Sequence, residues 1–193
     1  EVQQTPISAV GDRVKAARLA LPEWSRLARH RRSAILQAAA DRIRAESEQL
    51  AHLLCQESGK PLQQSRFEVG FAVDLLAANA AMIRWMRDRM IATEALPGTE
   101  NDLAWETRKP LGVVAAILPF NFPLELLVEK AGAALAMGNA VIVKLPEETP
   151  LSVLRVVQIL HEAGVPENAL IPVIGGREAG QEDALGHFFP PTA

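Results

Sequence analysis

The sequence predicts an α/β protein in which long N-terminal amphipathic helices precede part of a doubly wound, Rossmann-like parallel sheet. Two observations lead to this fold class. Apolar residues recur at helical spacing through most of the chain before Pro97. After Pro110, three apolar runs alternate with two helical patterns in the order β-α-β-α-β, and connections of that length join parallel strands.

The first half is expected to be helical at residues 10–20, 31–57 and 64–90. Gly59 and Pro61 are the stop signals that follow the second of these helices. A turn at Pro97-Gly98 then leads into residues 103–107, where Leu103 and Trp105 alternate with smaller or charged residues. This alternation predicts a short, half-buried strand.

The second half supplies the sheet. Strands are expected at 112–118, 141–145 and 170–174, and helices at 124–137 and 151–163. The unbroken apolar run 112–118 predicts a strand buried on both faces. Thr149 is expected to cap the last helix, with Pro150 at its first position. These elements make up half of a doubly wound fold, and a complete fold needs a second half.

Composition excludes several classes of protein. The net charge of −3 argues against binding to a nucleic-acid backbone. The longest apolar run, 111–119, is too short to span a bilayer. The single cysteine excludes an internal disulfide and a multi-cysteine metal site, and it favours a reducing, cytoplasmic setting. The four histidines lack metal-ligand spacing, so no metal is expected.

The chain lacks the common catalytic and phosphate-binding signatures. It contains no G-x-G-x-x-G, no P-loop and no G-x-S-x-G elbow. Cys55 lies within a helical pattern, close to its apolar face, and has no neighbouring histidine in the sequence. We therefore expect Cys55 to be a packed, inert thiol rather than a nucleophile.

Asn121 is the first candidate for chemistry. It lies in Pro-Phe-Asn-Phe-Pro, directly after the first buried strand, and ligands of open parallel sheets bind beyond the carboxyl ends of the strands. An asparagine amide there can stabilise a developing oxyanion. The alternative is that Asn121 caps the following helix while the prolines shape the turn.

Lys144 and Glu147 form a second candidate site, at the end of the second strand. An acidic residue at this position can accept hydrogen bonds from ribose hydroxyls of a dinucleotide. Lys144 can bind a ribose hydroxyl or a phosphate. The alternative is a solvated loop with a chance ion pair.

At these residues the chain resembles the aldehyde dehydrogenase superfamily. The stretch 110–150, PLGVVAAILPFNFPLELLVEKAGAALAMGNAVIVKLPEETP, is close to the hallmark of that family. The resemblance extends back through the helices to residues 14–17 and forward to Gly-Val-Pro at 164–166, and it weakens after Gly180. It therefore covers most of the chain.

The resemblance implies NAD-dependent, or NADP-dependent, oxidation of an aldehyde to a carboxylic acid through a cysteine thiohemiacetal. In this family an asparagine matching Asn121 stabilises the oxyanion. The adenosine-ribose contacts match Lys144 and Glu147, and Leu118, Pro119 and Phe120 would approach the cofactor. Glu147 favours NAD, because a carboxylate repels a 2′-phosphate.

The chain also departs from the family pattern. Phe120 stands where most members have tryptophan, and Leu145-Pro146 replaces Pro-Ser. The family's nucleophilic cysteine and general-base glutamate have no counterpart in the 193 residues. We therefore expect a fragment that ends before the catalytic cysteine and that has essentially no turnover alone.

Four segments are expected. They are a helical part of the coenzyme-binding domain at 1–101, a strand of a possible oligomerisation extension at 102–109, half a Rossmann-like NAD-binding unit at 110–176, and an atypical tail at 177–193. The expected partners are an aldehyde substrate and further copies of the chain, without nucleic acid or membrane. Two alternatives remain open: a non-catalytic module for self-association or docking, and a fragment of an acylating relative that uses CoA or an acyl phosphate.

Overall fold

The computed structural model describes residues 4–175, so the expected tail at 177–193 lies outside the described residues. Four helices come first: α1 (Ile7–Arg26), α2 (Arg29–Ala45), α3 (Ser47–Ser58) and α4 (Leu62–Trp85). A parallel sheet of β3 (Val113–Ile117), β4 (Ala140–Lys144) and β5 (Leu170–Val173) follows, in the order β3-β4-β5. The α/β class and the β-α-β-α-β order predicted from the sequence are confirmed.

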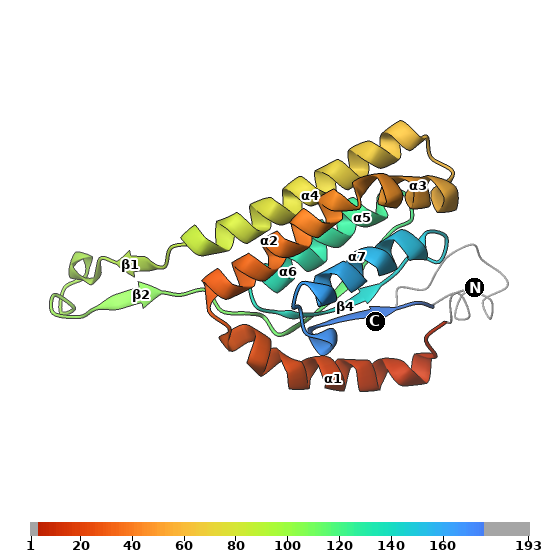
Figure 1. The fold of residues 1–193 in the computed structure, drawn as a ribbon. Coiled ribbons are helices and arrows are strands. Elements are labelled where there is room, and N and C mark those ends of the chain that lie inside the picture. The colour runs from red at the N-terminus through yellow and green to blue at the C-terminus, as the bar shows by residue number, and fades with distance from the viewer. Residues whose placement is uncertain (1–3, 176–193) are drawn as a thin grey trace, which may run out of the picture.

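The sheet lies between two unequal helical layers (Figure 1). Among residues 4–175, α1 covers one face, while α5 (Pro123–Leu127), α6 (Ala133–Ala136) and α7 (Pro150–Glu162) cover the other. α2 and α4 pack outside this second layer. The main hydrophobic core lies between the sheet and these helices, and a smaller core lies beneath α1.

The single helix expected at 31–57 is two helices, α2 and α3, because the helical conformation is interrupted at Glu46. Its φ of −99° and ψ of 11° end α2 and begin α3. The Glu46 carboxylate accepts hydrogen bonds from Nε (2.8 Å) and Nη2 (2.6 Å) of Arg155 on α7. The apolar periodicity continues across the break since both helices face the same core, so the break is invisible in the pattern.

The expected helix at 64–90 ends early, at Trp85, and that at 10–20 is longer, spanning all of α1. Met86 is already extended, and its carbonyl accepts a hydrogen bond of 2.7 Å from Arg29 Nη1. The chain then forms β1 (Arg89–Ile91), the short helix η1 (Thr93–Ala95) and β2 (Ala104–Glu106).

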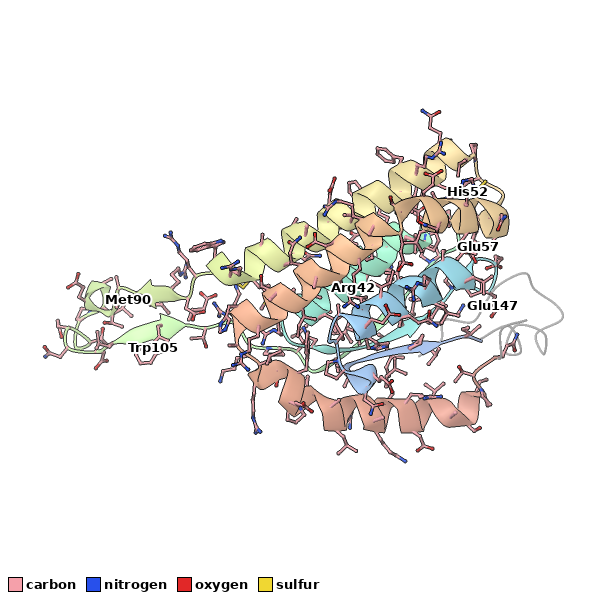
Figure 2. All side chains as sticks on the ribbon, in the orientation of Figure 1. Arg42, His52, Glu57, Met90, Trp105 and Glu147 are labelled. Atoms are coloured by element: carbon pink, nitrogen blue, oxygen red, sulfur yellow. The ribbon has the colours of Figure 1, made fainter. Side chains whose placement is uncertain are left out.

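β1 and β2 pair in antiparallel fashion and project from the body of the molecule (Figure 1). The sequence correctly predicts a strand near 103–107, but it is not half-buried. Trp105 is 66% exposed and Leu103 is 77% exposed. Figure 2 shows Met90 and Trp105 on this projection, away from the core. The pair therefore presents apolar side chains to solvent.

β3 was expected to be buried on both faces, and this is wrong for its carboxyl half. On one face Ala116 and Leu118 are buried against the helices. On the other face α1 packs against Val113, while Ala115 and Ile117 remain exposed. α1 makes most of its sheet contacts with β4 and packs on β3 at Val113, while the carboxyl half of this face of β3 stays exposed.

The helix expected at 124–137 is continuous in space but contains a π-helical turn, η2 (Val128–Gly132), between α5 and α6. The strands at 141–145 and 170–174 and the helix at 151–163 are found at β4, β5 and α7. A short 3₁₀ turn, η3 (Glu167–Ala169), leads into β5. None of the helices within residues 4–175 combines the length and apolar character that a bilayer crossing requires.

Candidate functional site

The loops that follow β3 and β4 lie side by side at the carboxyl edge of the sheet. Ile117 and Lys144, the last residues of the two strands, are register partners. Leu118 N donates a hydrogen bond of 3.0 Å to the Lys144 carbonyl. The Thr149 hydroxyl donates one of 3.4 Å to the Phe120 carbonyl. The two candidate segments of the sequence therefore meet at one edge.

The N-terminus of α5, just after Asn121, is completed by a residue from α4. Glu68 is fully buried, and its Oε1 accepts the Leu124 N–H at 2.8 Å. Its Oε2 pairs with the Lys60 ammonium. Lys60 Nζ also donates to the Asn121 carbonyl at 2.6 Å and lies 4.5 Å from the centre of the Phe122 ring.

The capping alternative for Asn121 is wrong. α5 begins at Pro123, and the residue at its cap position is Phe122. The Leu124 N–H is taken by Glu68. The Asn121 side chain is exposed, and no residue between 4 and 175 forms a hydrogen bond with its amide. This amide is therefore available to a ligand.

The second loop places its two candidates at the same end of the sheet. Lys144 and Glu147 are both half-buried, and Glu147 is visible there in Figure 2. The Thr149 position at the start of α7 was predicted, with Pro150 at the first helical position. The Thr149 side chain does not cap the helix, however, because its hydroxyl is turned to Phe120.

Glu57, from the last turn of α3, caps α7 instead. Its Oε2 accepts the Leu151 N–H at 2.8 Å, and its Oε1 accepts the Ser152 N–H at 3.0 Å. The Ser152 hydroxyl donates to the same oxygen. Figure 2 shows Glu57 at the same end of the molecule as Glu147.

The starts of α5 and α7 are poor phosphate sites. Helix N-termini often bind phosphate groups, because their free N–H groups and dipole attract anions. Here the Leu124 N–H of α5 is bound to Glu68, and the Leu151 and Ser152 N–H groups of α7 are bound to Glu57. The negative charge of these two carboxylates repels a phosphate. Lys144 and Glu147 lie half-buried at the same edge, and their assignment to ribose hydroxyls stays a prediction.

Lys130 also lies at this edge, although no pattern in the sequence marks it as a site residue. Lys130 Nζ donates a hydrogen bond of 2.9 Å to the Ile117 carbonyl at the end of β3. Lys130 belongs to the π-helical turn η2, and such turns are frequent at functional sites. No spacing in the sequence marks a π turn, so only the structure could reveal this placement.

Other candidate groups lie elsewhere. Cys55 is half-buried on α3, which lies in the helical layer rather than at the strand ends. Within the part of the chain that the structure describes, no group of three or more histidine, cysteine, aspartate or glutamate side chains could hold a metal ion.

Comparison with known proteins gives consistent matches. The model of the aldehyde dehydrogenase family matches residues 1–184. Aspartate-semialdehyde dehydrogenase 1 of Pseudomonas canavaninivorans is 41% identical over 155 residues, which are 80% of this chain and 33% of that protein. The NADP/NAD-dependent aldehyde dehydrogenase PuuC of Escherichia coli is 40% identical over 162 residues, 82% of this chain and 32% of PuuC.

Solved structures agree with these relatives. The aldehyde dehydrogenase KauB of Pseudomonas aeruginosa superposes with a TM-score of 0.83 at 37% identity, covering 90% of this chain and 35% of KauB. The glyceraldehyde-3-phosphate dehydrogenase GapN of Methanocaldococcus jannaschii, complexed with NADP, gives 0.85 at 28% identity, covering 92% and 39%. The chain thus spans about a third of the length of the curated relatives it matches.

Proposed function

The chain belongs to the aldehyde dehydrogenase family, and on this premise we propose that it is the cofactor-binding part of an enzyme that oxidises an aldehyde to a carboxylic acid with NAD or NADP. The observation that carries the proposal is the meeting of two loops at one sheet edge. One loop holds Asn121 with an unbonded amide, and the other holds Lys144 and Glu147.

Asn121 acts on the aldehyde oxygen in this proposal. Its amide N–H donates a hydrogen bond to the negative charge that develops on that oxygen, and a neutral donor does so without changing its own charge. The Phe120 and Asn121 carbonyls are both bound by other residues, which fixes the backbone from which the amide projects. A nucleophile and a general base must come from outside the described residues.

The cofactor supplies a hydride acceptor when it is bound. Leu118, Pro119 and Phe120 lie at the end of β3, where they would contact it. Lys144 and Glu147 would hold the hydroxyls of its adenosine ribose. Because Glu147 is a carboxylate, it repels a 2′-phosphate, and we propose a preference for NAD over NADP.

We further propose that the projecting strands are part of an oligomer interface, within the segment 102–109 and its partner strand β1. Exposed Met90, Leu103 and Trp105 lie on this projection. Contiguous exposed apolar groups mark interaction surfaces. The segment 110–176 is then the NAD-binding half-unit and 1–101 its helical cover. The single cysteine is our reason for placing the protein in the cytoplasm.

A titration of the ¹⁵N-labelled chain with NAD, and separately with AMP, tests the cofactor site. The amide resonances of Leu118, Phe120, Lys144, Leu145 and Glu147 are expected to shift with both ligands, since AMP carries the adenosine end. Glu147→Ala should abolish these shifts, while Glu148→Ala, the matched control, and Asn121→Ala should leave them. Undiminished shifts in the Glu147→Ala chain would refute the ribose contact.

A chimera tests the reaction. In it, this chain replaces the segment of PuuC to which it matches. Asn121→Ala should lower kcat by about 10²–10³-fold, the usual cost of removing an oxyanion donor, with little change in NAD binding. A tenfold change in kcat corresponds to about 1.4 kcal/mol of transition-state stabilisation. A kcat within about threefold of the parent chimera is a smaller loss than this and would exclude the oxyanion role.

A further inference from the structure

We propose that Lys60 and Glu68 are positioning residues that hold the Asn121 loop in its working geometry. This inference rests on the proposed function of Asn121 and deepens it. Neither residue belongs to the loops that follow β3 and β4. Both come from the helical first half of the chain and reach the loop through contacts 56 to 61 residues distant in sequence.

The position of Lys60 is set by the connection between α3 and α4. Gly59 ends α3 in the left-handed conformation, with a φ of 71°, and Pro61 occupies the cap position of α4. Lys60 is held between these two helix ends, and its side chain is 13% exposed. The two helix ends fix the backbone of Lys60, and from this position its ammonium group reaches the Asn121 loop.

Glu68 is the more unusual group, because it is a completely buried carboxylate. A buried charge is tolerated only when it is paired and hydrogen-bonded. Here one oxygen accepts the Leu124 N–H and the other binds the Lys60 ammonium. A cap alone would explain the first contact. It does not explain why the charge is neutralised by a residue that also binds the loop.

Lys60 contacts the loop at Asn121 itself and at the residue that follows it. Its Nζ donates to the Asn121 carbonyl at 2.6 Å, and it lies over the Phe122 ring at 4.5 Å. The Thr149 hydroxyl holds the preceding carbonyl, that of Phe120. The backbone is therefore fixed before, at and after Asn121, while its amide stays unbonded. A preorganised hydrogen-bond donor needs this combination.

Variants can separate two roles. In the cap, Glu68 accepts the Leu124 N–H. In the clamp, Lys60 holds the Asn121 carbonyl and the Phe122 ring. Glu68→Gln keeps an oxygen that can accept the Leu124 N–H and leaves Lys60 in place. Lys60→Met alone strands a buried charge, so it is combined with Glu68→Gln. This double variant keeps the cap and removes the clamp. Lys60→Arg tests rescue. Arg66→Met, which removes an exposed ion pair between Arg66 of α4 and Glu48 of α3, is the matched control.

The first readout is the order of the loop in the ¹⁵N-labelled chain. In the double variant, the backbone order parameters of residues 120–122 should fall from about 0.85 to below about 0.6, with the Asn121 side-chain NH₂ pair broadened. The midpoint of urea unfolding is measured for each variant on unlabelled protein. Glu68→Gln, Lys60→Arg and Arg66→Met should keep a rigid loop. A rigid loop in the double variant would overturn the inference.

The second readout is activity in the PuuC chimera. The double variant should lower kcat at least about tenfold with KM within about twofold, since the lost interaction matters only in the transition state. In an Asn121→Ala background the same double variant should change kcat less than about twofold, because it acts through Asn121. An undiminished effect in that background would refute positioning of Asn121.

The two readouts distinguish this inference from the proposed function. If Asn121→Ala leaves kcat unchanged, the oxyanion role fails, whereas the ordering of the loop by Lys60 is still decided by the order parameters. If the loop stays rigid without the clamp, the positioning role fails and the role of Asn121 stands.

Discussion

Replacing Glu57 by alanine should lower the free energy of unfolding by about 2 kcal/mol. Loss of a helix N-cap typically costs about 1 kcal/mol, and loss of a carboxylate at a helix N-terminus a further ~0.5 kcal/mol. Ser152 is fully buried, so its hydroxyl would lose its acceptor, at about 1 kcal/mol or more. Water can replace the carboxylate at the exposed Leu151, which offsets part of this sum.

Urea unfolding followed by circular dichroism measures this loss. Glu57→Gln should cost about half as much, because the amide oxygen retains an acceptor while the charge is gone. Ser152→Ala completes a double-mutant cycle in which the coupling energy with Glu57→Ala should be about 1 kcal/mol. A loss below about 0.5 kcal/mol for Glu57→Ala, or additivity of the two changes, would refute the assignment of Glu57 as the cap.

Three further predictions concern stability and association. The hydrogen bonds from Arg155 lower the pKa of Glu46, so the stability that this pair contributes is present at neutral pH and is lost as pH falls from the ordinary glutamate pKa through the lowered one. Glu46→Gln should therefore flatten the decline in unfolding free energy between about pH 5 and 3, and an unchanged slope would contradict the linkage. Trp24→Phe should cost about 2 kcal/mol in urea unfolding, because the buried indole loses its 3.1 Å hydrogen bond to the Leu135 carbonyl. The exposed Trp85→Phe is its control, expected within about 0.5 kcal/mol of the parent chain. Trp105→Ser should change stability by less than about 0.5 kcal/mol yet reduce association in sedimentation velocity, and unaltered association would argue against the projecting strands as an interface.

The strands of the sheet could be predicted because they are unbroken apolar runs. The helices that connect them could be predicted because they end at glycines, Gly138 and Gly164. Local signals sufficed for those elements. They failed at positions that contact distant partners. The break between α2 and α3 falls at Glu46, whose carboxylate binds Arg155, 109 residues away. β1 contains Met90, whose spacing fits the preceding helix, and only its pairing with β2 makes it a strand.

The candidate site divides in the same way. Asn121 could be placed at the end of β3 from the alternation of strands and helices alone. The capping alternative could be settled only by the structure, because the residue that binds the Leu124 N–H is Glu68, 56 positions earlier. Lys60 gave no signal, since a lysine after a helix-ending glycine is ordinary in sequence.

The carboxylates of Glu57 and Glu68 also bear on the order in which the chain folds. Each belongs to a helix of the first half and completes a helix of the second, across 94 residues for Leu151 and 56 for Leu124. α7 has 13 residues, and α5 continues through η2 and α6 to Ala136, so both helices are near the roughly 12–15 residues that an isolated helix needs in water. Both helices therefore gain their stability on docking.

A ribosome makes α3 and α4 before either of these helices. Glu57 and Glu68 are therefore already synthesised when β3 and β4 emerge. Each carboxylate can accept its hydrogen bond as soon as α5 or α7 forms. A circular permutant that begins at β3 would reverse this order. We expect it to reach the same native state more slowly, with unpaired helix termini until its last segment is complete.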